Sequence, residues 1–329
     1  MIPRWRLFTK YAAFIIALVS AALIAVEMRA ADVVRIGFLA PDEEPRYSQL
    51  LAGLRQGLRD LGHRDNELIV HEQRVPRGDN ARAASGARTL QREQVRVTFV
   101  VGTELGRVVR KEAPELPIVF ITPGDPVGVG LVASLARPGG NVTGMTFEHP
   151  ELTAKRIELM RELAPQVRRV VVLYDRRDAS PRQGFAAARD AAPRFGLTLV
   201  ELAVEDVQSN PKAIGLRGKF DGLLVIPGGA VSTVSARVIE HAQRERAVSV
   251  ASDRAVATQY VLLSYGASDV DVAREAARLV DRIAKGQRAA ELPVERPVRL
   301  RLSVNARVAR AVGIAIPQSV LVRADEVIE

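Results

Sequence analysis

The sequence predicts an α/β protein made of two doubly wound, Rossmann-like lobes. Short runs rich in β-branched residues alternate with longer segments whose apolar residues recur at helical spacing, and this pattern occurs twice along the chain. Strands that alternate with helices indicate a mostly parallel sheet with helices on both faces, because parallel strands need crossover connections. A length of 329 residues is enough for two such units.

The first half of the chain has four predicted strands with helices between them. A strand over 33–40 is followed by a helix over 48–61, in which Leu50, Leu54 and Leu58 share one face and which ends at Gly62. Further strands are predicted at 68–75, 95–101 and 117–122, and further helices at 81–93 and 104–113.

The second half repeats this organisation after Gly139-Gly140-Asn141. A segment over 142–147 leads into an amphipathic helix over 151–163. The later strands are predicted at 169–174, 197–204, 222–226 and 248–251, and the later helices at 182–195, 235–246 and 253–259.

The C-terminal tail is expected to pass between the two lobes. It contains a helix over 270–285, a linker over 292–297, a strand over 298–302 and a helix that begins at Ser303 or Asn305. We expect residues 32–145 with about 267–293 to form the first lobe, and residues 146–266 with about 294–329 to form the second.

Residues 1–31 have the organisation of a secretory signal, because Arg4, Arg6 and Lys10 precede an uninterrupted run of apolar or small residues over 11–26. As a helix this run would rise about 24 Å, which is less than the ~30 Å hydrocarbon core of a bilayer. The sequence therefore predicts export from the cytoplasm. Met28 or Arg29 stands where a small residue is preferred before a cleavage site, so an uncleaved N-terminal anchor stays open.

Composition and motifs exclude several other classes. The chain has no cysteine, which removes disulfides, thiolate catalysis and cysteine zinc sites. Its four histidines are isolated, and it contains neither a P-loop nor a nucleophile-elbow motif, so no metal, cofactor or catalytic residue is predicted. The net charge of +9 is spread over arginine-rich helices without a long basic run, which disfavours nucleic-acid binding.

Ligands of open α/β sheets bind at the carboxyl ends of the strands, so the loops that follow the strands supply the candidate binding residues. Thr103 offers a hydroxyl at a helix start, and Asp125 can accept hydrogen bonds from an ammonium group, although both could instead cap helices. Tyr174 could stack on a ring or pack in the core. The predicted ligand-binding residues are Asp42, Thr103, Glu104, Thr122, Asp125, Tyr174, Asp175, Gly228 and Asp253.

Several segments of the chain match the pattern of one known protein family. The densest of them opens with Gly124-Asp125-Pro126-Val127-Gly128 and continues through Ala136-Arg137-Pro138-Gly139-Gly140-Asn141-Val142-Thr143-Gly144. The other matching segments are Arg35-Ile36-Gly37-Phe38-Leu39, Glu151-Leu152-Thr153-Ala154-Lys155-Arg156, Leu263-Ser264-Tyr265-Gly266 and Leu292-Pro293-Val294-Glu295-Arg296-Pro297. On these segments the chain resembles the substrate-binding proteins of ABC transporters, of the kind that includes tryptophan- and tyrosine-binding members.

This resemblance implies a type I periplasmic binding protein, without enzymatic activity, that closes its lobes on a small solute and presents the closed form to a membrane permease. The hinge between the lobes is then expected at three strand-like crossings, near 142–148, 266–269 and 292–297. We expect such a protein to be a monomer and its solute to be an aromatic amino acid. A periplasmic sensor that signals to a receptor is the alternative, and a two-lobed enzyme is the third. Family members commonly carry Gly-Thr-Pro where this chain has Gly102-Thr103-Glu104, and often Asn-Pro where it has Asp175-Arg176. The resemblance therefore predicts the fold better than it predicts the identity of the ligand.

Overall fold

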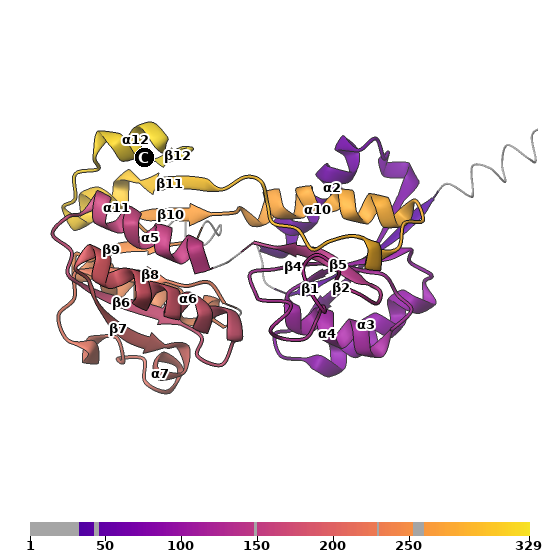
Figure 1. Ribbon diagram of the computed structural model, residues 1–329, viewed down its shortest axis with the longest axis horizontal. Helices are drawn as coiled ribbons and strands as arrows, with labels where there is room; N and C mark the ends of the chain where they lie inside the picture. Colours follow the sequence, from indigo (N-terminus) through magenta and orange to yellow (C-terminus); the bar gives the residue numbers. More distant parts are fainter. Residues whose placement is uncertain (1–32, 43–45, 148–149, 229, 253–259) are drawn as a thin grey trace, which may run out of the picture.

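The computed structural model describes residues 33–42, 46–147, 150–228, 230–252 and 260–329, which form two α/β lobes side by side (Figure 1). Each lobe has one twisted sheet with helices on both of its faces. The predicted fold of two doubly wound lobes is therefore confirmed.

The first lobe contains a five-stranded sheet in the order β2-β1-β3-β4-β5, with all neighbouring strands parallel. Successive residues of β1 alternate between the two faces, so that Phe38 packs with α2 and α10 while Leu39 packs with α3 and α4. The elements are β1 Val34–Pro41, α2 Arg46–Asp60, η1 Asp65–Glu67, β2 Leu68–Val75, α3 Asn80–Arg92, β3 Val97–Val101, α4 Thr103–Glu112, β4 Ile118–Thr122, β5 Val142–Thr146, α10 Asp269–Ala284 and η4 Ala289–Glu291.

The second lobe contains a seven-stranded sheet in the order β12-β11-β10-β9-β8-β6-β7, in which β10 and β11 are antiparallel and the other pairs are parallel. Helices α5, α6, α11 and α12 pack on one face, and α7 and α8 pack on the other. The elements are α5 Pro150–Leu163, β6 Arg169–Tyr174, α6 Ala179–Ala191, η2 Ala192–Phe195, β7 Thr198–Ala203, α7 Val204–Ser209, η3 Gly215–Arg217, β8 Gly222–Val225, α8 Ser232–Arg244, β9 Val248–Ala251, β10 Leu263–Gly266, β11 Arg301–Asn305, α11 Ala306–Val312, α12 Gln318–Arg323 and β12 Glu326–Ile328.

The chain passes between the lobes three times, after β5, between β10 and α10, and before β11 (Figure 1). The last crossing runs beside β5, because the N–H of Glu295 donates to the carbonyl of Gly144 and the carbonyl of Glu295 accepts from Thr146, each at 2.9 Å. Helix α10 follows the second crossing and packs against α2. The first and the last crossing thus lie next to each other at the first lobe.

Most predicted strands coincide with observed ones, and those at 68–75, 169–174 and 248–251 match β2, β6 and β9 at both ends. The strand predicted over 298–302 is observed over Arg301–Asn305, because Val298 is 91% exposed and pairing with β10 begins only at Arg301. Ser303 lies within β11, so the next helix begins after Asn305, whose side chain caps it. The helix predicted over 253–259 lies outside the described residues.

The predicted signal over residues 1–31 also lies outside the described residues and stays a prediction. From Val33 onward, none of the helices that the structure describes is both long and apolar enough to cross a membrane.

Candidate functional site

A cavity of about 130 Å³ lies between the two lobes, at the carboxyl ends of their strands. The first lobe contributes the ends of β1, β2, β3 and β4 with the segments that follow them, and the second contributes the start of α6 and Pro227 after β8. This is the edge at which open α/β sheets bind ligands. The polar side chains of its wall include those of Arg46, Arg77, Thr103, Glu104, Thr122, Asp178 and Ser180.

The N-terminus of α4 forms part of the cavity wall. Gly102 precedes this helix with φ of +100°, a conformation that favours glycine, and Thr103 and Glu104 are the first residues of the helix. The first N–H groups of a helix have no acceptor within the helix. Gly124 leaves room for the Thr103 side chain, since a Cβ there would lie 3.3 Å from Thr103 Cγ2. Together, these N–H groups and the Thr103 hydroxyl can bind an acceptor group of a ligand.

Asp178 faces the same cavity from the second lobe. It caps α6, where its Oδ1 accepts a hydrogen bond from the N–H of Ser180 at 3.1 Å. Burial raises the pKa of Asp178 above its ordinary value, and the negative charges of Asp175 and Glu104 add to this effect, while the Ser180 N–H and Arg182 oppose it. One carboxylate from each lobe, Glu104 and Asp178, therefore borders the cavity.

Two arginines of the first lobe also border the cavity. Arg46 Nε lies 2.6 Å from Oδ2 of Asp269, a residue that is only 4% exposed, so an ion pair compensates this charge within the lobe. Arg77 Nη2 donates a hydrogen bond of 3.3 Å to the Ser232 hydroxyl on α8 of the second lobe. Arg77 thus links the two lobes at the edge of the cavity.

A second cavity of about 210 Å³ adjoins the first, and the two share Gly124 and Ser180. Two hydrogen bonds join the lobes here, from Gln183 Nε2 to Asp125 Oδ2 at 3.0 Å and from the Ser180 hydroxyl to the carbonyl of Pro123 at 2.9 Å. Burial raises the pKa of Asp125, but hydrogen bonds from the Gly128 N–H, Gln183 and the Val127 N–H outweigh it, so the pKa lies below its usual range. Asp125 therefore orders its own loop and contacts the opposite lobe.

Replacing Gln183 with Ala is expected to weaken binding of a ligand in the cavity by about two- to tenfold, because a hydrogen bond between the two lobes, with a net contribution of about 0.5–1.5 kcal/mol, is lost. Isothermal titration calorimetry measures this loss. The melting temperature of the ligand-free protein is expected to change little. Gln91→Ala, at an exposed position on α3, is the matched control, and an equal loss in both variants would contradict the role of Gln183.

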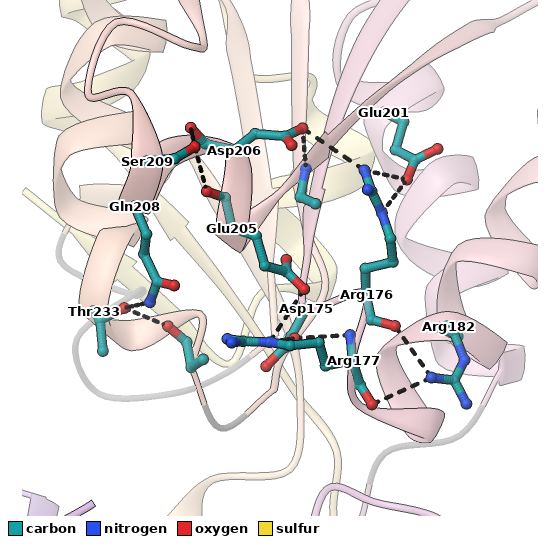
Figure 2. A network of polar contacts seen from close by, with 12 residues as sticks. Asp175, Arg176, Arg177, Arg182, Glu201, Glu205, Asp206, Gln208, Ser209 and Thr233 are labelled. Carbon is teal, nitrogen blue, oxygen red and sulfur yellow. Dashed lines mark hydrogen bonds and ion pairs between the residues drawn. The ribbon is translucent and has the colours of Figure 1, made fainter. Parts of the chain in front are cut away.

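Three predicted residues lie on the second lobe away from the cavity wall. Tyr174 stacks on Phe185 with ring centroids 4.6 Å apart, and its hydroxyl donates to Glu201 at 2.6 Å. Asp175 is buried, and Figure 2 shows Arg177 between Asp175 and Glu205, with Nε to oxygen distances of 3.5 and 3.1 Å. Gly228 lies against Pro181. Tyr174 and Asp175 are thus engaged within their own lobe.

The remaining predicted residues have three different outcomes. Thr122 lines the cavity with Thr103 and Glu104, and its hydroxyl accepts from the N–H of Gly124 at 2.9 Å. Asp42 lies on the first lobe 3.3 Å from Arg74 Nη1 and does not line the cavity. Asp253 lies outside the described residues.

Sequence reasoning missed Arg46, Arg77, Asp178 and Ser180 as residues of the cavity wall. Asp178 had a detectable signal, because an Asp followed by Ser180-Pro181 shortly after a strand is typical of a helix start. No sequence signal marked Arg46, since it lies at the start of α2 and reaches the cavity only through the packing of α2 beside β1.

The structure has two α/β lobes joined by three crossings, and a cavity lies between the lobes at the strand ends. These features define the class of two-lobed solute-binding proteins. In the part of the chain that the structure describes, no group of three or more His, Cys, Asp or Glu side chains could hold a metal ion. The chain belongs to the ABC transporter substrate binding protein family, whose sequence model matches residues 35–328. Members of this family bind solutes and are not enzymes.

Known relatives agree with this assignment. A curated relative, the tyrosine-binding protein of Clostridioides difficile strain R20291, is 24% identical over 260 residues, which is 79% of this chain and 75% of the relative. The crystal structure of an ABC domain from Streptococcus pneumoniae in complex with L-Trp is similar with a TM-score of 0.80 and 24% identity, and the match covers 90% of this chain and 99% of that one. The crystal structure of a conserved domain protein from Vibrio cholerae O1 biovar El Tor is similar with a TM-score of 0.79 and 26% identity. This match also covers 90% of this chain and 99% of that one.

Proposed function

We propose that this protein is the periplasmic substrate-binding component of an ABC importer, which captures a small solute by closing its lobes and presents the closed form to a membrane permease. The observation that carries the proposal is the cavity between the lobes, since both lobes contribute to its wall. A ligand that contacts both lobes only when they are together shifts the equilibrium towards the closed state by its difference in affinity for the two states.

Hydrogen bonds across the cleft support closure as the mechanism. Arg77, Ser180 and Gln183 each take part in a bond between the lobes. These bonds join side chains to groups on the opposite lobe, so a rotation about the three crossings can break them without unfolding either lobe. This mechanism is also compatible with a protein that is tethered to the membrane because residues 1–31 are not cleaved.

The solute that we propose is an amino compound, and the aromatic amino acids are the first to be tested. The support comes from relatives, one described as tyrosine-binding and another solved with L-Trp bound. A thermal-shift screen of the exported protein against amino acids, nucleosides and sugars tests this, because a ligand that binds only the native state raises the melting temperature. A shift with sugars or nucleosides alone would contradict the ligand class.

Replacing Thr103 with Ala is expected to weaken binding of the solute found in that screen by about tenfold, which corresponds to the loss of one hydrogen bond of about 1.4 kcal/mol. Titration calorimetry gives the two dissociation constants. Thr198→Ala, at an exposed position at the start of β7, should bind as the unchanged protein does. Unchanged affinity in Thr103→Ala would remove Thr103 from the binding site.

The role in import is tested separately by measuring uptake of the labelled solute in cells with and without this protein. Loss of uptake in its absence is expected. Unimpaired uptake together with a lost transcriptional response to the solute would instead identify the protein as a sensor.

A further inference from the structure

Among the residues that the structure describes, the charges of the cavity wall are unbalanced in favour of negative charge. The charged side chains in this part of the wall are those of Arg46, Arg77, Glu104 and Asp178. Asp269 compensates Arg46 at 2.6 Å, which leaves Arg77 as one positive charge against the two carboxylates. Glu104 forms no hydrogen bond or ion pair with any residue that the structure describes.

The two carboxylates belong to opposite lobes and affect each other across the cavity. Glu104 lies in the first turn of α4 in the first lobe, and Asp178 caps α6 in the second. The charge of Glu104 disfavours ionisation of Asp178. Like charges that approach as the lobes close oppose closure of an empty cavity, whereas a cation between them attracts both lobes.

The other charged side chains that the structure describes after β6 are satisfied within the second lobe. Asp175 pairs with Arg177, and Arg176 lies near both Glu201 and Asp206, with distances of 3.1 and 3.8 Å from its Nη2 (Figure 2). Arg182 donates to the carbonyls of Arg176 and Arg177. The imbalance is therefore concentrated on Glu104 and Asp178 at the cavity.

We propose that the solute carries a net positive charge, and that its ammonium or guanidinium group lies between Glu104 of the first lobe and Asp178 of the second. This inference rests on the proposed function and narrows its ligand class to cationic amines and cationic amino acids. The free N–H groups at the start of α4 are then available for a carboxylate, where the solute has one.

The test compares compounds that share a skeleton and differ in net charge. The pairs are L-arginine with L-citrulline, and tryptamine with L-tryptophan, measured by thermal shift and titration calorimetry on the exported protein. In at least one pair the cationic member is expected to bind at least about tenfold more tightly, because a charge-assisted pair from each lobe is formed. Glu104→Gln and Asp178→Asn should each remove this preference.

Matched controls separate the site from the overall charge. Glu115→Gln and Asp190→Asn remove one negative charge each at exposed positions on the same two lobes, and Asp190 lies on α6 as Asp178 does. Both controls should keep the preference for the cation. Asn at position 178 can still cap α6, so Asp178→Asn is expected to fold.

The ligand-free protein provides a second readout. At neutral pH, Glu104→Gln and Asp178→Asn are each expected to raise the melting temperature, because they relieve the repulsion between two carboxylates and the cost of burying one. The raised pKa of Asp178 means that this cost is present at high pH and is relieved as the pH falls through that pKa. Affinity for a cation should fall over the same pH interval, starting above the range of an ordinary aspartate.

The outcomes distinguish this inference from the proposed function. If the neutral member of each pair binds as tightly as the cationic one, or if only neutral solutes bind in the wider screen, the charge assignment is wrong and the solute-binding role stands. If no solute of any class binds, both fail. If the preference for cations persists in Glu104→Gln and Asp178→Asn, the assignment to these two carboxylates is overturned.

Discussion

Gly57→Leu is expected to destabilise the first lobe by more than about 3 kcal/mol, because this position has no space for a side chain. A Cβ on Gly57 would lie 2.3 Å from the carbonyl oxygen of Arg274 and 2.5 Å from Cβ of Ala277, both on α10. Gly53, one turn earlier on α2, approaches the carbonyl of Val270 in the same way. The small residues thus allow the two helices to pack closely, and α10 follows directly on the second crossing between the lobes.

Urea unfolding monitored by hydrogen exchange measures this loss lobe by lobe. Amides of α2, α10 and β1 are expected to lose protection at lower urea concentration, and those of β6 to β9 to change much less. Ala52→Leu adds a larger side chain at an exposed position of the same helix and should unfold as the unchanged protein does. A Gly57→Leu variant as stable as Ala52→Leu would contradict the close packing of α2 on α10.

Arg156→Ala is expected to destabilise the second lobe by about 3 kcal/mol or more, because it empties a fully buried site and removes the hydrogen bond to a partly buried carbonyl. Arg156 on α5 has no exposed surface, and its Nε donates to the carbonyl of Tyr265 at 2.8 Å. Tyr265 belongs to β10, immediately before the crossing that leads to α10. Arg156 therefore holds the end of this crossing that lies in the second lobe.

Lys155→Ala is the matched control for this variant. Lys155 lies next to Arg156 on the helix but is partly exposed, and its ion pair with Glu158 at 2.7 Å is of the surface type that contributes about 0.2–0.5 kcal/mol. Denaturant midpoints give the change in stability of both variants. Hydrogen exchange should show that the Arg156→Ala variant loses protection in α5 and β10. Equal stability of the two variants would contradict a structural role for the buried arginine.

Much of the fold could be predicted from the sequence because parallel strands covered on both faces are almost entirely apolar and are bounded by polar turns. The runs that became β6 and β9 have this form. The C-terminal tail does not have this apolar form, since Val298 is exposed. Strand β11 runs antiparallel to β10, and its start is fixed by pairing with β10. No local pattern specifies where that pairing begins.

The site could be predicted in part, for a comparable reason. The rule that ligands bind at the carboxyl ends of strands identified Thr103, Glu104 and Thr122, which the structure brings together at one cavity. It could not tell that Tyr174 points into the core against Phe185, because an aromatic residue at a strand end can face either way. It also overlooked Asp178, which reaches the cavity from a helix cap three residues beyond the Asp175 that was chosen.

Closure of the lobes on a solute is tested most directly by the distance between them. The chain has no cysteine, so Gln91→Cys on α3 and Leu216→Cys in η3, both exposed, allow one spin label on each lobe. Figure 1 places α3 and α7, which η3 follows, on the side of the lobes away from α10. Pulsed electron double resonance should show a shift to shorter distances when the solute that most raises the melting temperature is added at saturation. An identical distance distribution with and without that solute would contradict the account.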